Sequence, residues 1–292
     1  MSDSSIAILL PSALFIIMLG MGLALKPEDF LRVFSQPSKV LLGLGLQLLL
    51  LPVLGVLVVM MLDLPPLLAA GLMILTFAPG GATSNMISYL CRADTALSIS
   101  LTTITSLIIP LTLPTLTFIA LEFLLGQGTA IVFTITSTVA KLLMVSIVPV
   151  CIGVALNLRW PQYCRRLQSA VKWLSLLFML AVVIVITVAN YEMMPVLLPQ
   201  LAPAVLLLAI SAMLLGYLIP RYIFSQSNKS SLTYSVETGI QNAGTALMVT
   251  GAILQNSEMS MSVLMYGILM QIPALLLIAY RNLQPVRRLA ET

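Results

Sequence analysis

The stretch TYSVETGIQNAGTALMV, residues 233–249, lies within an apolar run long enough to cross a bilayer, yet its composition does not suit a continuous lipid-facing helix. It places a carboxylate at Glu237 and glycines at Gly239 and Gly244, which allow a helix to unwind. The alternative is that its polar groups only join neighbouring helices. A carboxylate suits that purpose poorly, so we predict an interrupted membrane helix around a functional acid. Its other polar residues are Gln241, Asn242 and Thr245.

The rest of the chain has the composition of a polytopic all-α membrane protein. Of its 292 residues, 60% are hydrophobic and 8% are charged, against about 25% charged in an ordinary soluble domain. Apolar runs separated by polar segments predict a single membrane unit with nine transmembrane helices. These lie at residues 5–25, 38–62, 66–91, 94–121, 130–157, 168–190, 197–220, 230–256 and 259–280.

A second interrupted helix is predicted at residues 76–90, TFAPGGATSNMISYL. Pro79 followed by two glycines stops a helix in the middle of the third predicted crossing, and Thr83, Ser84 and Asn85 follow it. The other interruption lies in the eighth crossing, so the two helices run in opposite directions. Paired interrupted helices of opposite direction are typical of inverted-repeat secondary transporters, which bind their ligands near the midplane.

The charges between the helices predict an orientation. With the N-terminus outside, thirteen of the fourteen basic residues fall in inner segments, and the outer segments carry only acidic residues. The C-terminus is then cytoplasmic. No basic residue precedes Lys26, so we expect the first apolar run to remain as a helix and not to be cleaved as a signal peptide. The outer acidic residues are Asp3, Asp63, Glu122, Glu192 and Glu258.

Several functional classes lack support in the sequence. It contains no nucleotide-binding loop, no metal-ligand cluster and no basic stretch interleaved with aromatic residues, so ATP-driven pumping and nucleic-acid binding are not predicted. An intramembrane enzyme would need Glu237 as a base and Ser84 as a nucleophile, which nothing else indicates. A passive channel would be revealed by single-channel conductance. We predict a transporter and not an enzyme, with the lipid bilayer and a small organic anion as partners.

Further oxygen atoms are predicted near the interruptions. Ser98, Thr102 and Thr105 share one helical face, although each could instead bond back to its own helix. Gln47 is a lone amide in an apolar run, and Lys141 is the other charge deep in a predicted helix, where we expect it to find a partner or a water-filled cavity. Such oxygen atoms suit a hard cation. Because the sequence has no histidine, sodium is favoured over protons as the coupling ion.

Three motifs in this order resemble the bile acid:sodium symporter family: LGMGLALKPEDF at residues 19–30, APGGATSN at 78–85 and ETGIQN at 237–242. The likeness runs from about residue 15 to 280. It implies a core domain of six helices that moves against a panel domain, with the interrupted helices crossing inside the core. The panel-like part would comprise residues 1–30 and 130–192, the core-like part 36–125 and 195–282, and a cytoplasmic tail 283–292.

The resemblance also implies two sodium ions that share Glu237. The first would be surrounded by Ser84, Asn85, Ser98, Thr102 and Glu237. The second would bind Glu237, Gln47, Gln241 and the backbone carbonyl groups of Thr238 and Ile240. The substrate would lie at the crossing, near Ala82, Thr83 and Asn242.

Two departures from the family pattern bear on the substrate and the topology. Ala82 stands where family members often have threonine, so a hydroxyl group is absent from the substrate wall, and some bacterial relatives have one further helix. Family members carry bile acids, 2-keto acids and pantoate-like acids, which implies a monocarboxylate. Because we find no secretory or organellar signal and the chain is compact, we expect a bacterial inner membrane. The alternative is a proton-coupled exporter of organic acids or oxyanions. An arsenite carrier would need a thiol in its interrupted helix, and none precedes Cys91 there.

Overall fold

The computed structural model describes residues 3–126, 133–189 and 191–283, and within these ranges the chain is helical, without a strand. Within these ranges, five helices are long and apolar enough to cross a membrane. They are Pro37–Met61, Thr95–Leu125, Ile135–Arg159, Met194–Ile223 and Ser257–Leu283, with shorter apolar helices at Leu9–Ala24, Pro66–Thr76 and Ala243–Ile253. This architecture is that of a polytopic helical membrane protein.

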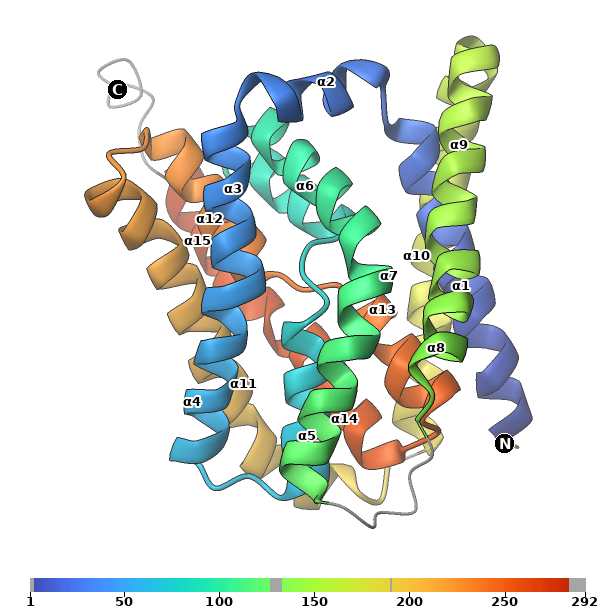
Figure 1. Ribbon diagram of the computed structural model, residues 1–292, viewed down its shortest axis with the longest axis vertical. Helices are drawn as coiled ribbons and strands as arrows, with labels where there is room; N and C mark the ends of the chain where they lie inside the picture. Colours follow the sequence, from blue (N-terminus) through green and yellow to red (C-terminus); the bar gives the residue numbers. More distant parts are fainter. Residues whose placement is uncertain (1–2, 127–132, 190, 284–292) are drawn as a thin grey trace.

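In the described residues of the first half, the chain forms seven α-helices and one π-helix (Figure 1). Proline begins α2, α3 and α5, because its missing N–H group costs nothing in the first turn. The bounds are α1 Asp3–Ala24, α2 Pro27–Ser35, α3 Pro37–Gly45, η1 Leu46–Leu50, α4 Leu51–Met61, α5 Pro66–Thr76, α6 Ala82–Leu90 and α7 Thr95–Leu125.

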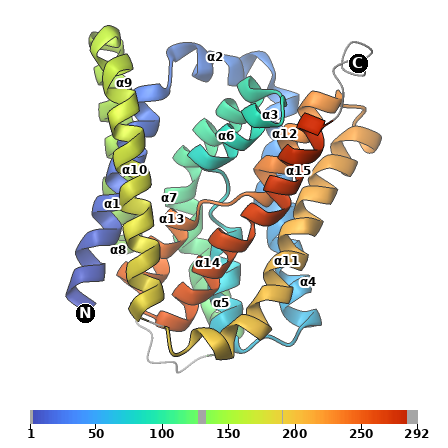
Figure 2. The same cartoon turned by 180° about the vertical axis from the view of Figure 1, so that it is seen from behind.

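The second half of the chain also contains both long helices and helices divided by π-turns (Figure 2). Pro52 and Pro149 each follow a π-turn, since a proline cannot bond to the carbonyl group four residues before it. The bounds are α8 Ile135–Leu142, η2 Leu143–Ile147, α9 Val148–Arg159, α10 Pro161–Ala189, α11 Met194–Leu218, η3 Ile219–Ile223, α12 Asn228–Gly239, α13 Ala243–Leu247, η4 Met248–Ile253, α14 Ser257–Leu269 and α15 Gln271–Leu283.

Lys141 lies differently from the prediction that placed it deep in the membrane. Helix α8 begins only at Ile135, so Lys141 is six residues from the first residue of the helix, and its side chain is exposed on the protein. A lysine two turns from a helix end can reach the membrane surface along its own stem. Lys141 thus lies nearer the start of its helix than predicted.

Helices α1, α8, α9 and α10 stand together on one side of the molecule, as both opposite views show (Figures 1 and 2). Helix α1 packs against α9 and α10. Gly22 makes the α1–α9 approach possible, because a Cβ atom there would lie 2.4 Å from the backbone oxygen of Val150. Helix α2 links α1 to α3 at one end of the molecule, which we call the α2 end.

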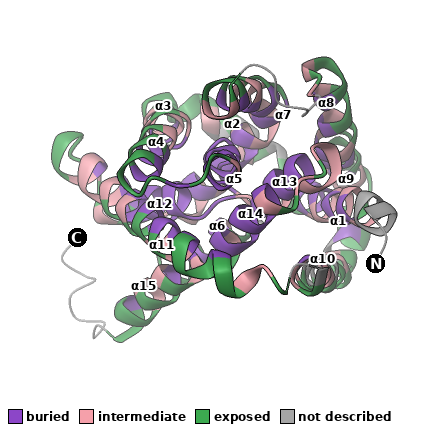
Figure 3. Cartoon of the chain, turned by 90° about the horizontal axis from the view of Figure 1, so that it is seen from below, coloured by how far each residue is buried: buried purple, intermediate pink, exposed green. Residues whose placement is uncertain are grey.

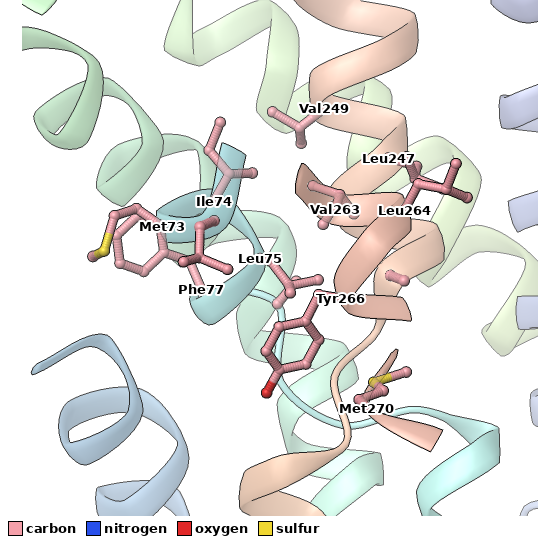
Figure 4. Packing of buried hydrophobic residues seen from close by; sticks show 14 of the residues in the cluster. Met73, Ile74, Leu75, Phe77, Leu247, Val249, Val263, Leu264, Tyr266 and Met270 are labelled. Carbon is pink, nitrogen blue, oxygen red and sulfur yellow. The ribbon is translucent and has the colours of Figure 1, made fainter. Parts of the chain in front are cut away.

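The apolar core surrounds α5, α12 and α14, whose residues are buried at the centre of the view from below (Figure 3). Ile74 and Leu75 of α5 pack there beside Val263 of α14 (Figure 4). A backbone contact sets the distance between these two helices, since a Cβ atom on Gly71 would lie 2.4 Å from the oxygen of Met259. This packed centre holds the two interrupted helices in place.

Candidate functional site

The two interruptions meet. Helix α5 ends at Thr76 and α12 ends at Gly239, and in each case a non-helical segment leads to the next helix. The backbone N–H of Asn242 donates to the oxygen of Ala78 at 2.8 Å. Pro79 and Gln241 form an isolated antiparallel bridge. The unwound segments are therefore joined by backbone hydrogen bonds, at the crossing seen between α6 and α12 in Figure 1.

Gly80 gives the first interruption its shape. Its φ angle of +71° lies in the left-handed region, where a side chain is strained. A Cβ atom at this position would lie 3.1 Å from the Thr105 hydroxyl oxygen and 3.6 Å from Oε2 of Glu237. The glycine thus lets the backbone turn beside the buried carboxylate.

The carbonyl groups left free where α12 ends are satisfied by side chains. A helix end leaves such acceptors without backbone partners. Here each of three successive carbonyl groups receives a side-chain hydrogen bond, and Figure 4 shows the Tyr266 hydroxyl pointing out of the apolar cluster. The bonds run from Gln47 Nε2 to the Glu237 oxygen at 3.0 Å, from Gln241 Nε2 to the Thr238 oxygen at 2.7 Å, and from the Tyr266 hydroxyl to the Gly239 oxygen at 3.0 Å.

Two hydroxyl groups contact both the carboxylate of Glu237, which is fully buried, and the amide oxygen of Asn85. The Ser98 hydroxyl lies 2.5 Å from Oε1 of Glu237 and 2.7 Å from Oδ1 of Asn85. The Thr102 hydroxyl lies 3.3 Å from Oε2 of Glu237 and 3.2 Å from the same Asn85 oxygen. Two hydroxyl groups carry only two hydrogen atoms for these four contacts. The contacts are satisfied if the Asn85 amide turns over to donate, if Glu237 carries a proton, or if a cation lies among the oxygen atoms.

Ser84 lies at the edge of this group. Its hydroxyl donates to the Gly81 oxygen at 2.8 Å, and it also interacts with the Glu237 carboxylate. The residue is buried at the start of α6. Its oxygen can therefore face both the helix start and the carboxylate.

A second set of oxygen atoms lies on the Gln47 side of Glu237. The Gln47 amide nitrogen is 3.3 Å from Oε2 of Glu237. Within the described residues, three buried side-chain oxygen atoms here accept no hydrogen bond: Oε1 of Gln47, Oε1 of Gln241 and Oγ1 of Thr238. An unsatisfied buried acceptor costs about 1–3 kcal/mol. The donor set, a carboxylate with amide and carbonyl oxygens, fits a hard cation at this place.

The residues predicted to contact the substrate lie where α6 and α13 begin. Thr83 is exposed and Asn242 is half-buried, and the side chain of Ala82 is not among those described. A Cβ atom on Gly81 would lie 3.8 Å from Cβ of Asn242, so the starts of α6 and α13 adjoin. Asn242 caps α13 by accepting the N–H of Thr245 at 3.1 Å. Two helix N-termini at one exposed place favour an anion.

Not every predicted oxygen faces this site, and one contributor was missed. Thr105 bonds back to its own helix, donating towards the carbonyl oxygens of Leu101 and Thr102 at 3.0 and 3.1 Å. Ile240 is buried in the unwound segment. Tyr266 was not predicted, although a tyrosine in an apolar helix normally finds a partner for its hydroxyl.

Comparison with known proteins places this membrane protein. Residues 11–197, more than half of the chain, match the Sodium Bile acid symporter family. The chain belongs to that family. It is similar to a probable chloroplastic sodium/metabolite cotransporter of Oryza sativa subsp. japonica, with 31% identity over 82% of this chain and 56% of the relative.

Two relatives of lower identity are also named as sodium-dependent carriers. An uncharacterized sodium-dependent transporter of Bacillus subtilis (strain 168) is 26% identical over 78% of this chain and 69% of its own length. The ileal sodium/bile acid cotransporter of Homo sapiens is 26% identical over 78% of this chain and 65% of its own length. The chain thus spans about half to two thirds of the length of these relatives. The family and these relatives are transporters and not enzymes.

Proposed function

We propose that this chain is a sodium-coupled symporter of a small organic anion. The observation that carries the proposal is the group of hard oxygen ligands, from Ser98, Thr102 and Asn85, gathered around the fully buried carboxylate of Glu237. A sodium ion bound there would neutralise the carboxylate inside the protein. The family name and the names of its sodium-dependent relatives support sodium as the ion.

Two ions are proposed, because Glu237 contacts two groups of polar side chains, one that contains Ser98 and Thr102 and one that contains Gln47. The first set is that of the hydroxyl groups and Asn85, with Ser84 at its edge. The second holds the unsatisfied oxygens of Gln47 and Gln241, with the backbone oxygens of Thr238 and Ile240 beside them. Binding of one ion would then fix Glu237 for the other, which makes sodium binding cooperative.

The substrate is proposed to be a monocarboxylate bound where α6 and α13 begin. Their N-terminal N–H groups attract a carboxylate, and Thr83 and Asn242 offer side-chain contacts beside them. Relatives named for bile acid and for metabolites support an organic anion as the class. The side chain at position 82, here alanine, would then influence which acid the site binds.

We further propose nine crossings in an inner cell membrane, with the N-terminus outside and the α2 end in the cytoplasm. The helix ends at the α2 end carry the basic residues, as the positive-inside rule requires. Helices α1 and α8–α10 would form the panel, and the other helices the core that carries both interruptions. Among these residues are Lys26 after α1, Arg92 after α6, Arg159 at the end of α9, Lys229 in α12 and Arg281 in α15.

Uptake into proteoliposomes tests this function. Purified protein is first screened for thermal stabilisation by monocarboxylates with and without sodium, since a ligand of the folded state stabilises it by mass action. Uptake of the best stabiliser is then measured with sodium or with choline outside, at one fixed pH. Uptake that needs sodium supports the proposal. Uptake that ignores sodium and follows a pH gradient would favour a proton-coupled exporter.

A further inference from the structure

A small polar pocket lies between the starts of α3 and α7, at the α2 end of the molecule. Its volume is about 130 Å³, and it contains one acidic side chain, Asp94. Oδ1 of Asp94 caps α7 by accepting the N–H of Leu97 at 3.1 Å. Within the described residues, Oδ2 forms no hydrogen bond or ion pair, so it is available to a cation. The pocket is lined by Gln36, Val40, Asp94, Ala96, Leu97 and Ser100.

An apolar cluster separates this pocket from the Glu237 site. Two of its members, Val40 and Leu97, also line the pocket. Its other members adjoin the proposed sodium ligands in sequence: Leu46 precedes Gln47, Leu101 precedes Thr102, and Tyr234 lies one turn before Glu237. We call Val40, Leu46, Leu97, Leu101 and Tyr234 the plug.

The plug is tightly packed and is tied across two helices by one tyrosine. A Cβ atom on Gly43 would lie 2.4 Å from Cδ2 of Leu101, so α3 rests directly on this side chain. Tyr234 is fully buried, and its hydroxyl donates to the Lys39 oxygen at 2.9 Å, which ties α12 to α3. Tyr234 therefore packs with two residues that line the pocket, Val40 and Leu97, and shares helix α12 with Glu237.

We propose that sodium passes between the Glu237 site and the cytoplasm along this α3–α7–α12 route, with Asp94 binding the ion in the pocket and Tyr234 acting as the gate. The inference rests on the proposed sodium-coupled function. A closed apolar constriction excludes water and ions, and a carboxylate in a pocket raises the local concentration of cations. Because Tyr234 and Glu237 lie one turn apart on α12, a movement of α12 that opens the gate also reaches the ion site.

Replacing Asp94 tests the pocket. Asp94→Asn keeps a good capping residue and removes the charge. We expect exchange of radioactive sodium across proteoliposomes to slow by about tenfold, because the pocket no longer concentrates cations. Equilibrium stabilisation of the protein by sodium is expected to stay unchanged. Glu28→Gln, an exposed acid on α2, is the matched control and should exchange at the wild-type rate.

Replacing Tyr234 tests the gate. Tyr234→Phe keeps the ring in the plug and removes the bond to Lys39, so we expect sodium exchange without substrate to rise by about three- to tenfold. Tyr217→Phe is the control, since it removes a similar hydroxyl bond, to Asn228 at 3.0 Å, outside the plug. Its exchange rate should equal that of the wild type.

The outcomes separate the two proposals. If the wild-type protein shows neither sodium stabilisation nor sodium exchange, the proposed function fails and the route fails with it. If the wild type binds and exchanges sodium while both variants exchange at the wild-type rate, the route alone is overturned. Loss of equilibrium sodium stabilisation in Asp94→Asn would also overturn the route, because it would place Asp94 in the binding site itself.

Discussion

Glu237 concentrates the charge of the site in one side chain, since its carboxylate is the acceptor common to both sets of oxygen atoms. We predict that Glu237→Gln weakens sodium binding by about 10- to 100-fold, the loss expected for an interaction with a charged group. The glutamine keeps the size of the side chain, so the protein should remain folded. The sodium-dependent rise in Tm measures the effect.

The control for this change is Glu122→Gln, which replaces an exposed glutamate near the end of α7. Its sodium-dependent rise in Tm should equal that of the wild type. Normal sodium stabilisation in Glu237→Gln would mean that the cation binds elsewhere.

Gln47 reports on the number of ions, because its unsatisfied oxygen belongs to the second set alone. We predict that Gln47→Leu lowers the Hill coefficient of sodium-dependent uptake from about 2 to about 1, since only the first ion still binds. The Glu237 backbone oxygen also loses its donor, so maximal uptake should fall. A wild-type coefficient already near 1 would contradict the two-ion proposal.

Gln271→Leu serves as the matched control. Its amide donates to the Gly267 oxygen in a neighbouring turn at 3.3 Å and takes no part in the crossing. The sodium dependence of uptake should be unchanged in this variant.

Among single residues, the sequence identified the polar side chains that stand within apolar runs. Glu237, Asn85 and Gln47 stood out because polar groups are rare in apolar runs. Thr105 and Tyr266 could not be assigned, because a hydroxyl in a membrane helix can bond to its own turn or to a neighbour with equal ease. Only the positions of the surrounding helices decide between these partners.

At the scale of the helices, the end of α12 is stabilised by a hydrogen bond from a neighbouring helix. Tyr266 of α14 donates to the Gly239 oxygen inside the protein, where water does not replace it. We predict that Tyr266→Phe destabilises the protein by about 1–3 kcal/mol, because a buried carbonyl group loses its donor. Thermal unfolding in detergent should show a lower Tm, and sodium should restore less of it than in the wild type.

Tyr191→Phe is the control, because Tyr191 is exposed and, among the residues that the structure describes, its hydroxyl bonds only to its neighbour Glu192, at 2.9 Å. Its Tm should match the wild type. An unchanged Tm in Tyr266→Phe would show that the end of α12 does not need this donor.

The interruptions were predictable because residues within each segment prevent a continuous helix. Pro79 and its glycines cannot continue a helix, and their effect needs no tertiary contact. The π-turns and the start of α8 were not predicted, because the apolar pattern continues through them. Hydropathy marks an apolar run but not the residue at which its helix begins, so Lys141 lies nearer the start of α8 than predicted.

At the scale of the whole molecule, the contacts between α1 and the interrupted segment suggest how the two parts are arranged. Helix α1 packs on α13 and η4, and α8 packs on α7, whereas α9 packs on α1 and α10. In the proposed orientation, α8 and α13 lie in the outer half of the membrane. The proposed panel and core would therefore meet on the outer side, which is the arrangement of a carrier closed to the outside.

A reducible thiol cross-linker tests this arrangement. A Cβ atom on Gly244 would lie 3.9 Å from Cδ1 of Leu14, so cysteines at these two positions would be close enough to join. We predict that cross-linking Leu14→Cys to Gly244→Cys, in a chain whose native cysteines are replaced by alanine, stops uptake. It should leave sodium stabilisation in place, because the Glu237 site lies wholly within the core.

Reduction should restore uptake, and either single cysteine treated with the same reagent should transport normally. Continued uptake by the cross-linked protein would show that α1 and α13 do not separate during transport. Ions and substrate held at the crossing can reach both sides of the membrane only if the contacts between the proposed panel and core open on each side in turn. A protein that transports with α1 and α13 joined would therefore not use this alternating-access mechanism. The distance between α1 and α13 is thus the quantity on which the carrier mechanism depends.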